Sequence, residues 1–377
     1  MSNFIQLHFL TAFPAANLNR DDTGAPKTVM FGGATRLRIS SQSLKRAWRT
    51  SEVFSEQLKK HIGIRTCRIA TEAAKIMMDG GVDQKTAVKW AAEIANKLGK
   101  AKKDKDSSSL VNTETEQLVH ISPEEMEKVR VLAKRLSEEK REPTEEELAI
   151  FQNKNHAVDI ALFGRMLASS PKFNVEAACQ VAHAIGVSAS VIEDDFFTAI
   201  DDLKQEADDA GAGHLGETAF GSAVFYNYIC LDFDLLVKNL DGDEPLAKKA
   251  VIALVEAALT TPPTGKQNSF GSRGYALWAL AEKGEFQPRS LAAAVCHPIS
   301  GNNMISDAIT RLETFRENLN SVYGQQTAFR KFDVTKPSGS MSELLEFVGQ
   351  WAGYGSISDI STIRANGVVG RVCSGRS

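Results

Sequence analysis

A short alternating strand that runs directly into an amphipathic helix constrains the fold most. Arg36–Ser40 alternates polar and apolar side chains, and the residues that follow, SSQSLKRAWR, place Leu44, Ala47 and Trp48 at helical spacing. The same apolar stripe continues to Leu58. A strand and a helix therefore follow one another without a long connection, and the first turn of this helix offers N–H groups that have no helical partner.

The stretch around this junction is strongly basic. Residues 20–49 hold seven lysines and arginines against two aspartates, a local charge of +5. The bases are Arg20, Lys27, Arg36, Arg38, Lys45, Arg46 and Arg49. A helix N-terminus flanked by such side chains is suited to a phosphate, and the glycines of the turn at Phe31–Gly33 let a ligand approach the backbone closely. The alternative is an ordinary capped helix with a solvated basic face.

The chain as a whole is not basic. It has 44 lysines and arginines against 47 aspartates and glutamates, so any nucleic-acid site has to be a local patch. Its five cysteines lie far apart, which argues against a zinc ribbon or a disulfide framework and favours a reducing, cytoplasmic location. No apolar run approaches the roughly 20 residues of a membrane span. The N-terminus, MSNFIQLHFLTAF, lacks the basic region of a signal peptide.

A length of 377 residues predicts about two to three folding units, and the character of the chain changes along it. Residues 3–10 and Ala223–Phe233 are dense in large apolar side chains and predict strands. Residues 65–150 predict a helical insertion, with capping boxes that begin at Ser122 and Thr144. Further helices are predicted at Pro245–Thr260, Asp307–Val322 and Met341–Trp351.

No motif predicts a convincing catalytic or cofactor site. Gly211–Gly216 matches GxGxxG, but an acidic segment precedes it instead of a strand, which favours a glycine-rich hinge over a dinucleotide site. Thr264–Gln267 lacks the first glycine and the Ser/Thr of a nucleotide-binding P-loop. The histidines show no metal-ligand spacing. Asp194–Asp195 and Asp201–Asp202 could hold a divalent metal ion, although such pairs more often cap helices or face water.

A set of short motifs in a fixed order resembles one protein family. The motifs are Asn17–Asp22 (NLNRDD), Phe31–Gly33 (FGG), Arg38–Ala47 (RISSQSLKRA), Asp159–Met166 (DIALFGRM), Ala182–Ile185 (AHAI), His214–Gly216 (HLG) and Gly265–Gln267 (GKQ). Together they resemble the CasC family, the repeated crRNA-binding backbone subunits of type I-E CRISPR Cascade complexes. The first and third motifs are highly specific, HLG or GKQ alone would mean little, and the helical insertion matches least.

The resemblance implies an α+β fold. Members of this family have a ferredoxin-like, RRM-related palm that carries a helical finger insertion and a thumb hairpin. Carried onto this chain, the palm and C-terminal region span residues 1–60, 156–195 and 224–377, the fingers 61–155 and the thumb 196–223. No RNP1-type sequence is present, so the RRM-like expectation comes from the resemblance.

The resemblance also implies roles for individual residues. Palm residues would contact guide phosphates, and a kink with one flipped nucleotide per subunit would form where apolar side chains wedge against an unstacked base. Met166 and Leu215 are the wedges, and ordinary core side chains are the alternative for both. The implied RNA-binding set is Arg20, Lys27, Arg38, Ser40, Gln42, Lys45, Arg46, Arg49, Arg165, Met166, Leu215, Lys266 and Gln267.

The function that the resemblance implies is a non-enzymatic scaffold that oligomerises along crRNA and presents it for pairing with complementary target DNA. Expected partners are crRNA, target DNA, several further copies of the chain (six in the expected assembly) and other Cascade subunits, with no membrane. No cofactor, metal ion or catalytic residue is expected. On charge alone, the loop Gly99–Ser109 could hold incoming duplex DNA through Lys100, Lys102, Lys103 and Lys105.

Two alternatives stay open. Related backbone subunits of other CRISPR types cleave target RNA through a thumb aspartate, so a divalent-metal-dependent RNase is the first alternative. The acids in that neighbourhood are Asp201, Asp202, Asp208 and Asp209. A filament made of protein alone is the second alternative.

Overall fold

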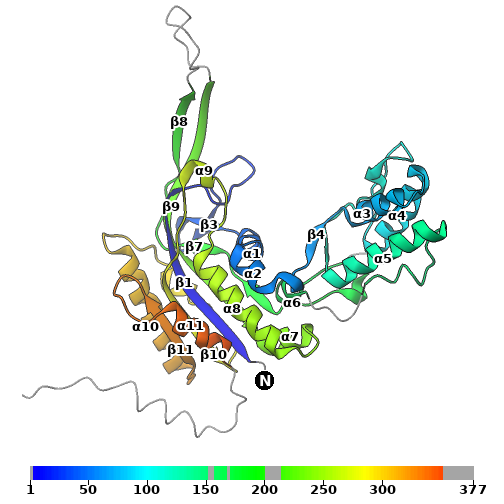
Figure 1. Cartoon of the computed structure of the whole chain (residues 1–377). Helices are drawn as coiled ribbons and strands as arrows, with labels where there is room; N and C mark the ends of the chain where they lie inside the picture. The colour runs from blue at the N-terminus through cyan, green and yellow to red at the C-terminus, as the bar shows by residue number, and fades with distance from the viewer. Residues whose placement is uncertain (1–2, 152–156, 168–169, 200–213, 351–377) are drawn as a thin grey trace, which may run out of the picture.

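The computed structural model describes residues 3–151, 157–167, 170–199 and 214–350. A central body is built on an antiparallel sheet, a helical finger module (residues 64–151) lies beside it, and a hairpin (residues 193–199 and 214–220) projects from the sheet (Figure 1). The mixed α and β class with an antiparallel sheet agrees with the expected α+β class.

Helices and strands alternate irregularly along the described residues. The strands are β1 Phe4–Ala16, β2 Thr28–Phe31, β3 Ala34–Ile39, β4 Ile64–Thr66, β5 Val119–Ile121, β6 Cys179–Val181, β7 Ala184–Gly186, β8 Glu193–Ala199, β9 His214–Asp232, β10 Ala276–Gly284 and β11 Ala328–Asp333. The α-helices are α1 Ser41–Arg49, α2 Glu52–Leu58, α3 Ile69–Asp79, α4 Gln84–Leu98, α5 Pro123–Glu139, α6 Val158–Phe163, α7 Phe233–Asn239, α8 Glu244–Thr260, α9 Gln267–Phe270, α10 Met304–Val322 and α11 Met341–Gly349.

The main sheet is arranged around β1. Its order is β11-β10-β1-β9-β7-β3-β2, and β6 and β8 also pair with β9. Phe4 of β1 lies opposite Gly284 of β10 on one side and opposite Asp232 of β9 on the other. Strand β9 is long enough to pair with β1 at one end and with β8 at the other, so the hairpin is a direct extension of the sheet.

Both faces of β1 are buried. Ile5 and Leu7 enter a core that includes side chains of α1, α2, α8 and α11. The alternate residues face the side that α10 covers, where polar groups are paired. His8 Nδ1 lies 2.8 Å from the Tyr226 hydroxyl, and the Tyr228 hydroxyl donates to Gln6 Oε1 at 2.9 Å. The prediction that residues 3–10 form a strand buried on at least one face is confirmed.

The finger module has its own hydrophobic core. Ala73, Met77 and Ala91 are fully buried where α3 packs against α4 and α5. The short sheet of β4 and β5 stands at the end of the module that is nearest the body (Figure 1). The capping box predicted at Ser122 is present, because Ser122 Oγ accepts from the Glu125 amide and the Glu125 carboxylate accepts from the Ser122 amide.

A second predicted helix start behaves differently. Thr144 and Glu147 form both hydrogen bonds of a capping box, at 3.3 and 3.0 Å, yet turns follow instead of an α-helix. Leu148 and Ile150 are both buried in the finger core, and their spacing of two residues does not fit one helical face. Packing therefore overrides the local helix signal here.

Other boundaries also differ from the sequence prediction. Strand β1 continues to Ala16, beyond the strand predicted at residues 3–10, and a short strand, β2, precedes the turn at Phe31–Gly33. The helix expected from Ser40 to Leu58 is divided, because Ser51 caps a second helix by accepting from the Phe54 amide. Helix α11 ends at Gly349, and Trp351 lies outside the described residues. Among the helices in the described ranges, none combines the length and apolar character needed to cross a membrane.

Candidate nucleic-acid interface

The N-terminus of α1 is capped largely by the protein itself. Ser40 Oγ accepts from the Ser43 amide at 3.3 Å, and the Ser41 amide donates to His183 Nδ1 at 3.2 Å. The Ser40 amide donates to Asn19 Oδ1 at 2.8 Å. Within the described residues, the Gln42 amide is the N–H of the first turn that has no hydrogen-bond partner. A phosphate at this helix end would therefore meet one open amide and depend on neighbouring cations.

Two of those cations surround His183. Arg38 Nη1 lies 3.0 Å from His183 Nδ1, the same atom that the Ser41 amide approaches. Partial burial, then Arg38 and Lys27, lower the pKa of His183 below its ordinary value. The imidazole is consequently neutral at pH 7 and accepts at Nδ1, while the positive charge stays on Arg38 and Lys27.

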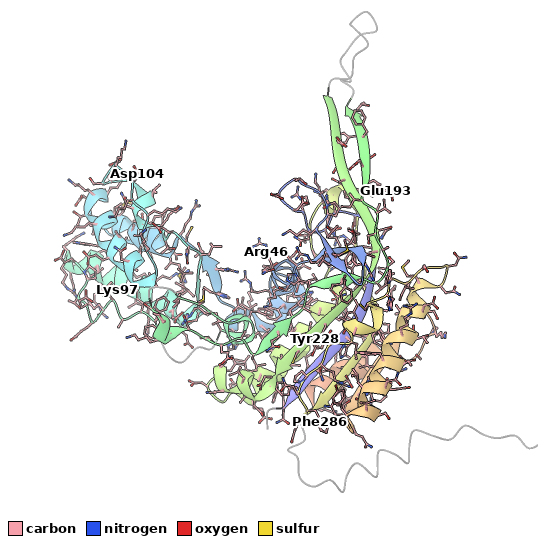
Figure 2. The ribbon with its side chains drawn as sticks, turned by 180° about the vertical axis from the view of Figure 1, so that it is seen from behind. Arg46, Lys97, Asp104, Glu193, Tyr228 and Phe286 are labelled. Atoms are coloured by element: carbon pink, nitrogen blue, oxygen red, sulfur yellow. The ribbon has the colours of Figure 1, made fainter. Side chains whose placement is uncertain are left out.

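Helix α1 adds cations on the side away from its apolar stripe. Arg46 is exposed, and Figure 2 shows it on the body between the finger module and the hairpin. Lys45 is half-buried with its ammonium 5.7 Å from the centre of the Phe163 ring. Arg49 is different, because its guanidinium lies 3.3 Å from the buried carboxylate of Asp159. We call Lys27, Arg38, Lys45 and Arg46 the β3–α1 cation set.

The loops near Arg20 and Lys266 pack against each other. A Cβ on Gly265 would lie 2.2 Å from the Leu18 carbonyl oxygen, so only glycine fits this contact. Both Arg20 and Lys266 are exposed. Gln267 is used within the protein, since its amide nitrogen donates to the carbonyls of Pro263 and Ser272 at 3.0 and 2.7 Å.

Arg165 and Met166 are neighbours with opposite surroundings. The Arg165 guanidinium is buried and pairs with Glu125 at 2.7 Å, so a direct RNA contact would require that pair to break. Met166 is 85% exposed, which removes the core alternative considered for it. On β9, Leu215 lies opposite Thr198 of β8, near the outer end of the described hairpin.

Two residues of the basic stretch have structural surroundings that sequence reasoning did not anticipate. Arg36 is fully buried and donates to the carbonyls of Gly186, Val295 and Cys296. A Cβ on Gly32 would lie 1.7 Å from the Cys296 carbonyl oxygen. The glycine of this turn therefore serves a contact within the protein, where the sequence suggested a ligand, and the local charge of residues 20–49 overstates the charge at the surface.

The four lysines of the finger loop differ in whether they form ion pairs. Lys100 pairs with Glu116 and Lys102 with Glu114, each at 2.7 Å. Lys103 and Lys105 are exposed and have no ion pair with another described residue. The four side chains therefore do not form one uniform basic loop.

Sequence reasoning missed an aromatic pair on the hairpin. Phe196 and Phe197 of β8 are 67% and 44% exposed, in a strand that also carries Glu193, Asp194 and Asp195. Successive residues of a strand point to opposite faces, and the Phe197 ring lies over Gly216 of β9, so Phe196 is the more open of the two. The signal is present in the sequence as Phe–Phe within an acidic segment.

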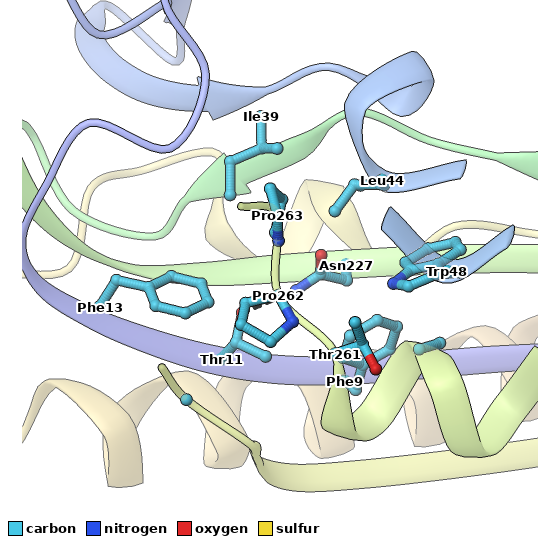
Figure 3. Close-up of a pocket in the computed structure, with 12 residues that line it drawn as sticks. Phe9, Thr11, Phe13, Ile39, Leu44, Trp48, Asn227, Thr261, Pro262 and Pro263 are labelled. Atoms are coloured by element: carbon cyan, nitrogen blue, oxygen red, sulfur yellow. Dashed lines mark hydrogen bonds between the residues drawn. The ribbon is translucent and has the colours of Figure 1, made fainter. Parts of the chain in front are cut away.

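A small cavity lies beneath α1 (Figure 3). Leu44 and Trp48 line it from α1, Phe9 from β1 and Asn227 from β9. Its volume of about 10 Å³ leaves room for a single water molecule, so it does not offer a small-molecule site. No group of three His, Cys, Asp or Glu side chains in the described ranges is arranged to hold a metal ion.

Comparison with known proteins identifies the family. A family model described as CT1975-like protein matches residues 5–347. The chain belongs to the CT1975-like protein family. No curated protein matches it.

Two solved structures have a similar fold to this CT1975-like chain. A chain of a "CRISPR RNA-guided surveillance complex, pre-nicking" matches with a TM-score of 0.79 and 30% identity, over 92% of this chain and 99% of that chain. A chain of a "CRISPR RNA-guided surveillance complex" matches with a TM-score of 0.68 and 25% identity, over 90% and 94%. The resemblance inferred from the sequence motifs is thereby confirmed.

The structure does not describe the aspartates considered for an RNase. Asp201, Asp202, Asp208 and Asp209 are outside the described residues, as is the GxGxxG segment up to Gly213. Asp194 and Asp195 lie on β8 opposite Ala219 and Thr218 of β9.

Proposed function

We propose that this chain is a subunit of a CRISPR RNA-guided surveillance complex that binds guide RNA along its body and presents it for pairing with target DNA. The observation that carries the proposal is the β3–α1 cation set at the junction between strand and helix. The two structural relatives are chains of RNA-guided surveillance complexes, and they match 92% and 90% of this chain. In this proposal the body is the ferredoxin-like, RRM-related palm of the backbone subunits.

The chemistry of the cation set suits a backbone contact. Lysine and arginine side chains neutralise phosphates without reading bases, so one surface can hold guides of any sequence. The open Gln42 amide adds a donor at the positive end of α1. Specificity for DNA then comes from base pairing with the guide, as in other RNA-guided systems. This division of labour requires no catalytic group on the chain.

Met166 and the hairpin complete the proposal. An exposed methionine can wedge against an unstacked base, and Leu215 of a neighbouring copy would supply the opposite wedge. Several copies along one guide, together with other Cascade subunits, would form the ribonucleoprotein. Arg165 and Arg49 are left out of the phosphate contacts because each pairs with a buried carboxylate.

The experiment that tests the proposal is purification of the chain from its native host without nuclease treatment, followed by sequencing of the bound nucleic acid. We expect RNA of uniform length that joins a repeat-derived sequence to a spacer. Assembly that persists after RNase treatment from the start of purification would favour a protein filament. A Mg²⁺-dependent cut at regular intervals in an RNA paired to the guide would favour the RNase.

A further inference from the structure

One buried carboxylate joins the body to the finger module. Asp159, in α6, is fully buried and lies among groups from three separate elements. Arg49 Nη1 of α1 and His120 Nε2 of β5 approach its Oδ2 at 3.3 and 2.7 Å. The Gly63 amide, in the connection that enters the finger module, donates to its Oδ1 at 2.8 Å. Both carboxylate oxygens are therefore used, and each partner belongs to a different part of the chain.

The electrostatics keep this carboxylate ionised. Burial by itself would raise the pKa of Asp159, but His120, the Gly63 amide and Arg49 together hold it below its ordinary value. A buried charge of this kind is stable only while its partners remain in place, and losing one of them leaves the charge uncompensated. The arrangement of the partners is therefore strongly restrained.

The packing around the junction is equally tight. A Cβ on Gly63 would lie 2.7 Å from the Ile121 carbonyl oxygen and 3.1 Å from the His120 ring. Arg165, which follows α6, reaches the His120 carbonyl at 3.3 Å and pairs with Glu125 of the finger helix α5. The finger core and the body core are separate clusters, so the direction of the finger module is set where these few contacts meet.

We propose that Asp159 is a positioning residue that fixes the direction of the finger module relative to the β3–α1 cation set, and that Arg49 serves this junction instead of contacting a guide phosphate. The part concerning RNA rests on the proposed function. The finger module borders the space into which Arg46 points (Figure 2), so a change in its direction would alter the surface that guide RNA meets.

The test measures finger direction and RNA binding separately. Dyes are attached through unnatural amino acids at positions 134, on α5, and 249, on α8, because both residues are exposed. Single-molecule energy transfer in the RNA-free protein then reports the distance between module and body. The variants are Asp159→Asn, Arg49→Ala and Arg49→Lys, with Lys45→Ala as the control for a phosphate contact.

We expect Asp159→Asn and Arg49→Ala to broaden the energy-transfer distribution and to weaken guide binding about tenfold, with an unchanged dependence of affinity on salt. Arg49→Lys should restore a narrow distribution, because an ammonium can still pair with Asp159. Lys45→Ala should do the reverse, leaving the distribution unchanged and flattening the salt slope by about 0.7.

Two results would overturn the proposal. One is an unchanged distribution in folded Asp159→Asn, and the other is an Arg49→Ala variant whose salt slope flattens as that of Lys45→Ala does. If Asp159→Asn does not fold, the comparison of Arg49→Ala with Arg49→Lys decides the question. If neither the wild-type protein nor any variant binds RNA and the distribution still broadens in Asp159→Asn, the proposed function fails while the positioning role of Asp159 stands.

Discussion

Arg36 and Arg165 are buried cations, whereas Arg20 and Arg46 are exposed ones. A guanidinium enters the interior only when hydrogen bonds or a carboxylate replace its water. Arg36 obtains three backbone carbonyls, and Arg165 obtains Glu125. These partners come from distant parts of the chain, so a count of charges along the sequence cannot separate a buried arginine from one available to a ligand.

Lys45 and Arg46 provide the first prediction, since both belong to the β3–α1 cation set and neither has an ion pair with another described residue. Replacing both by Ala should flatten the slope of log K for guide RNA against log salt by about 1.4, at about 0.7 per phosphate on a single strand. Binding should weaken alike for guides of every sequence. The measurement is a salt titration by fluorescence anisotropy, with Lys249→Ala on α8 as the control. An unchanged slope would remove these residues from the interface.

His8 provides a prediction for pH. Burial lowers the pKa of His8, as do Arg289 and Arg316, while Glu282 opposes them. The unfolded chain therefore binds a proton at His8 more readily than the folded chain does, and stability should fall as the pH drops below about 6.5. Melting temperature recorded between about pH 7.5 and about pH 5.5 should decline, and His8→Gln should flatten that decline.

His183 is the matched control for this measurement, because its pKa is also lowered but its ring is only partly buried. His183→Gln should change the pH dependence of the melting temperature less than His8→Gln. An equal or larger effect of His183→Gln would mean that the buried histidine is not the main source of the acid sensitivity.

At the scale of elements, the sequence predicts the helix starts that are fixed by residues close to them in the chain. The Ser40 and Ser122 caps are present, because each depends on residues close in sequence. The strand predicted at 223–233 is part of β9, but β9 begins earlier, at His214, and ends at Asp232. The division between α1 and α2 also has a local cause, because Ser51 accepts from the Phe54 amide and so caps a second helix. Packing instead decides the turns after Thr144, where side chains enter the finger core. Likewise, the exposed cations of the site were predictable, but the ion pair of Arg49 with Asp159 was not.

The turn between β2 and β3 permits a test with two adjacent glycines. Gly32 and Gly33 both have positive φ, 59° and 77°, so a side chain is strained at either position. A Cβ on Gly32 would also collide with the Cys296 carbonyl, whereas nothing lies within 4 Å of one on Gly33. Gly33→Ala should cost on the order of 1 kcal/mol of unfolding free energy. Gly32→Ala should cost roughly 1–3 kcal/mol more. Equal losses in urea denaturation would contradict the packing that the structure shows.

At the scale of the whole molecule, the chain consists of a body from which the finger module and the hairpin extend in different directions (Figure 1). The body core and the finger core are distinct, and the hairpin exposes Phe196 and Phe197 far from either. In the proposed function, these extensions are the parts that would contact RNA and other subunits.

The finger lysines give a prediction for the assembled complex. Lys103 and Lys105 should attract duplex DNA more strongly than Lys100 and Lys102, because carboxylates already neutralise the latter two. Lys103→Ala with Lys105→Ala should slow DNA association several-fold at low salt and leave guide binding intact. The pair Lys100→Ala and Lys102→Ala is the matched control, measured by stopped-flow fluorescence. Equal slowing by both pairs, or a loss of guide binding, would place these lysines in another role.

The last prediction concerns Met166 and separates its effect on protein stability from its effect on the bound guide. Because its side chain is 85% exposed, Met166→Ala should change the unfolding free energy of the RNA-free protein by less than about 0.5 kcal/mol. Met77 is fully buried in the finger core, and Met77→Ala should cost about 2–5 kcal/mol. A wedge contributes shape and no charge, so Met166→Ala should leave the salt slope of guide binding unchanged.

The effect of Met166→Ala should appear instead in the bound guide. Chemical probing should show altered reactivity at regularly spaced nucleotides, because an unstacked base loses the side chain that it rests against. Leu215→Ala should alter the same nucleotides if a neighbouring copy supplies the second wedge, and Lys45→Ala should not. A uniform change along the whole guide would mean that Met166 contributes general contact area, and the kink would then have to be formed by other residues.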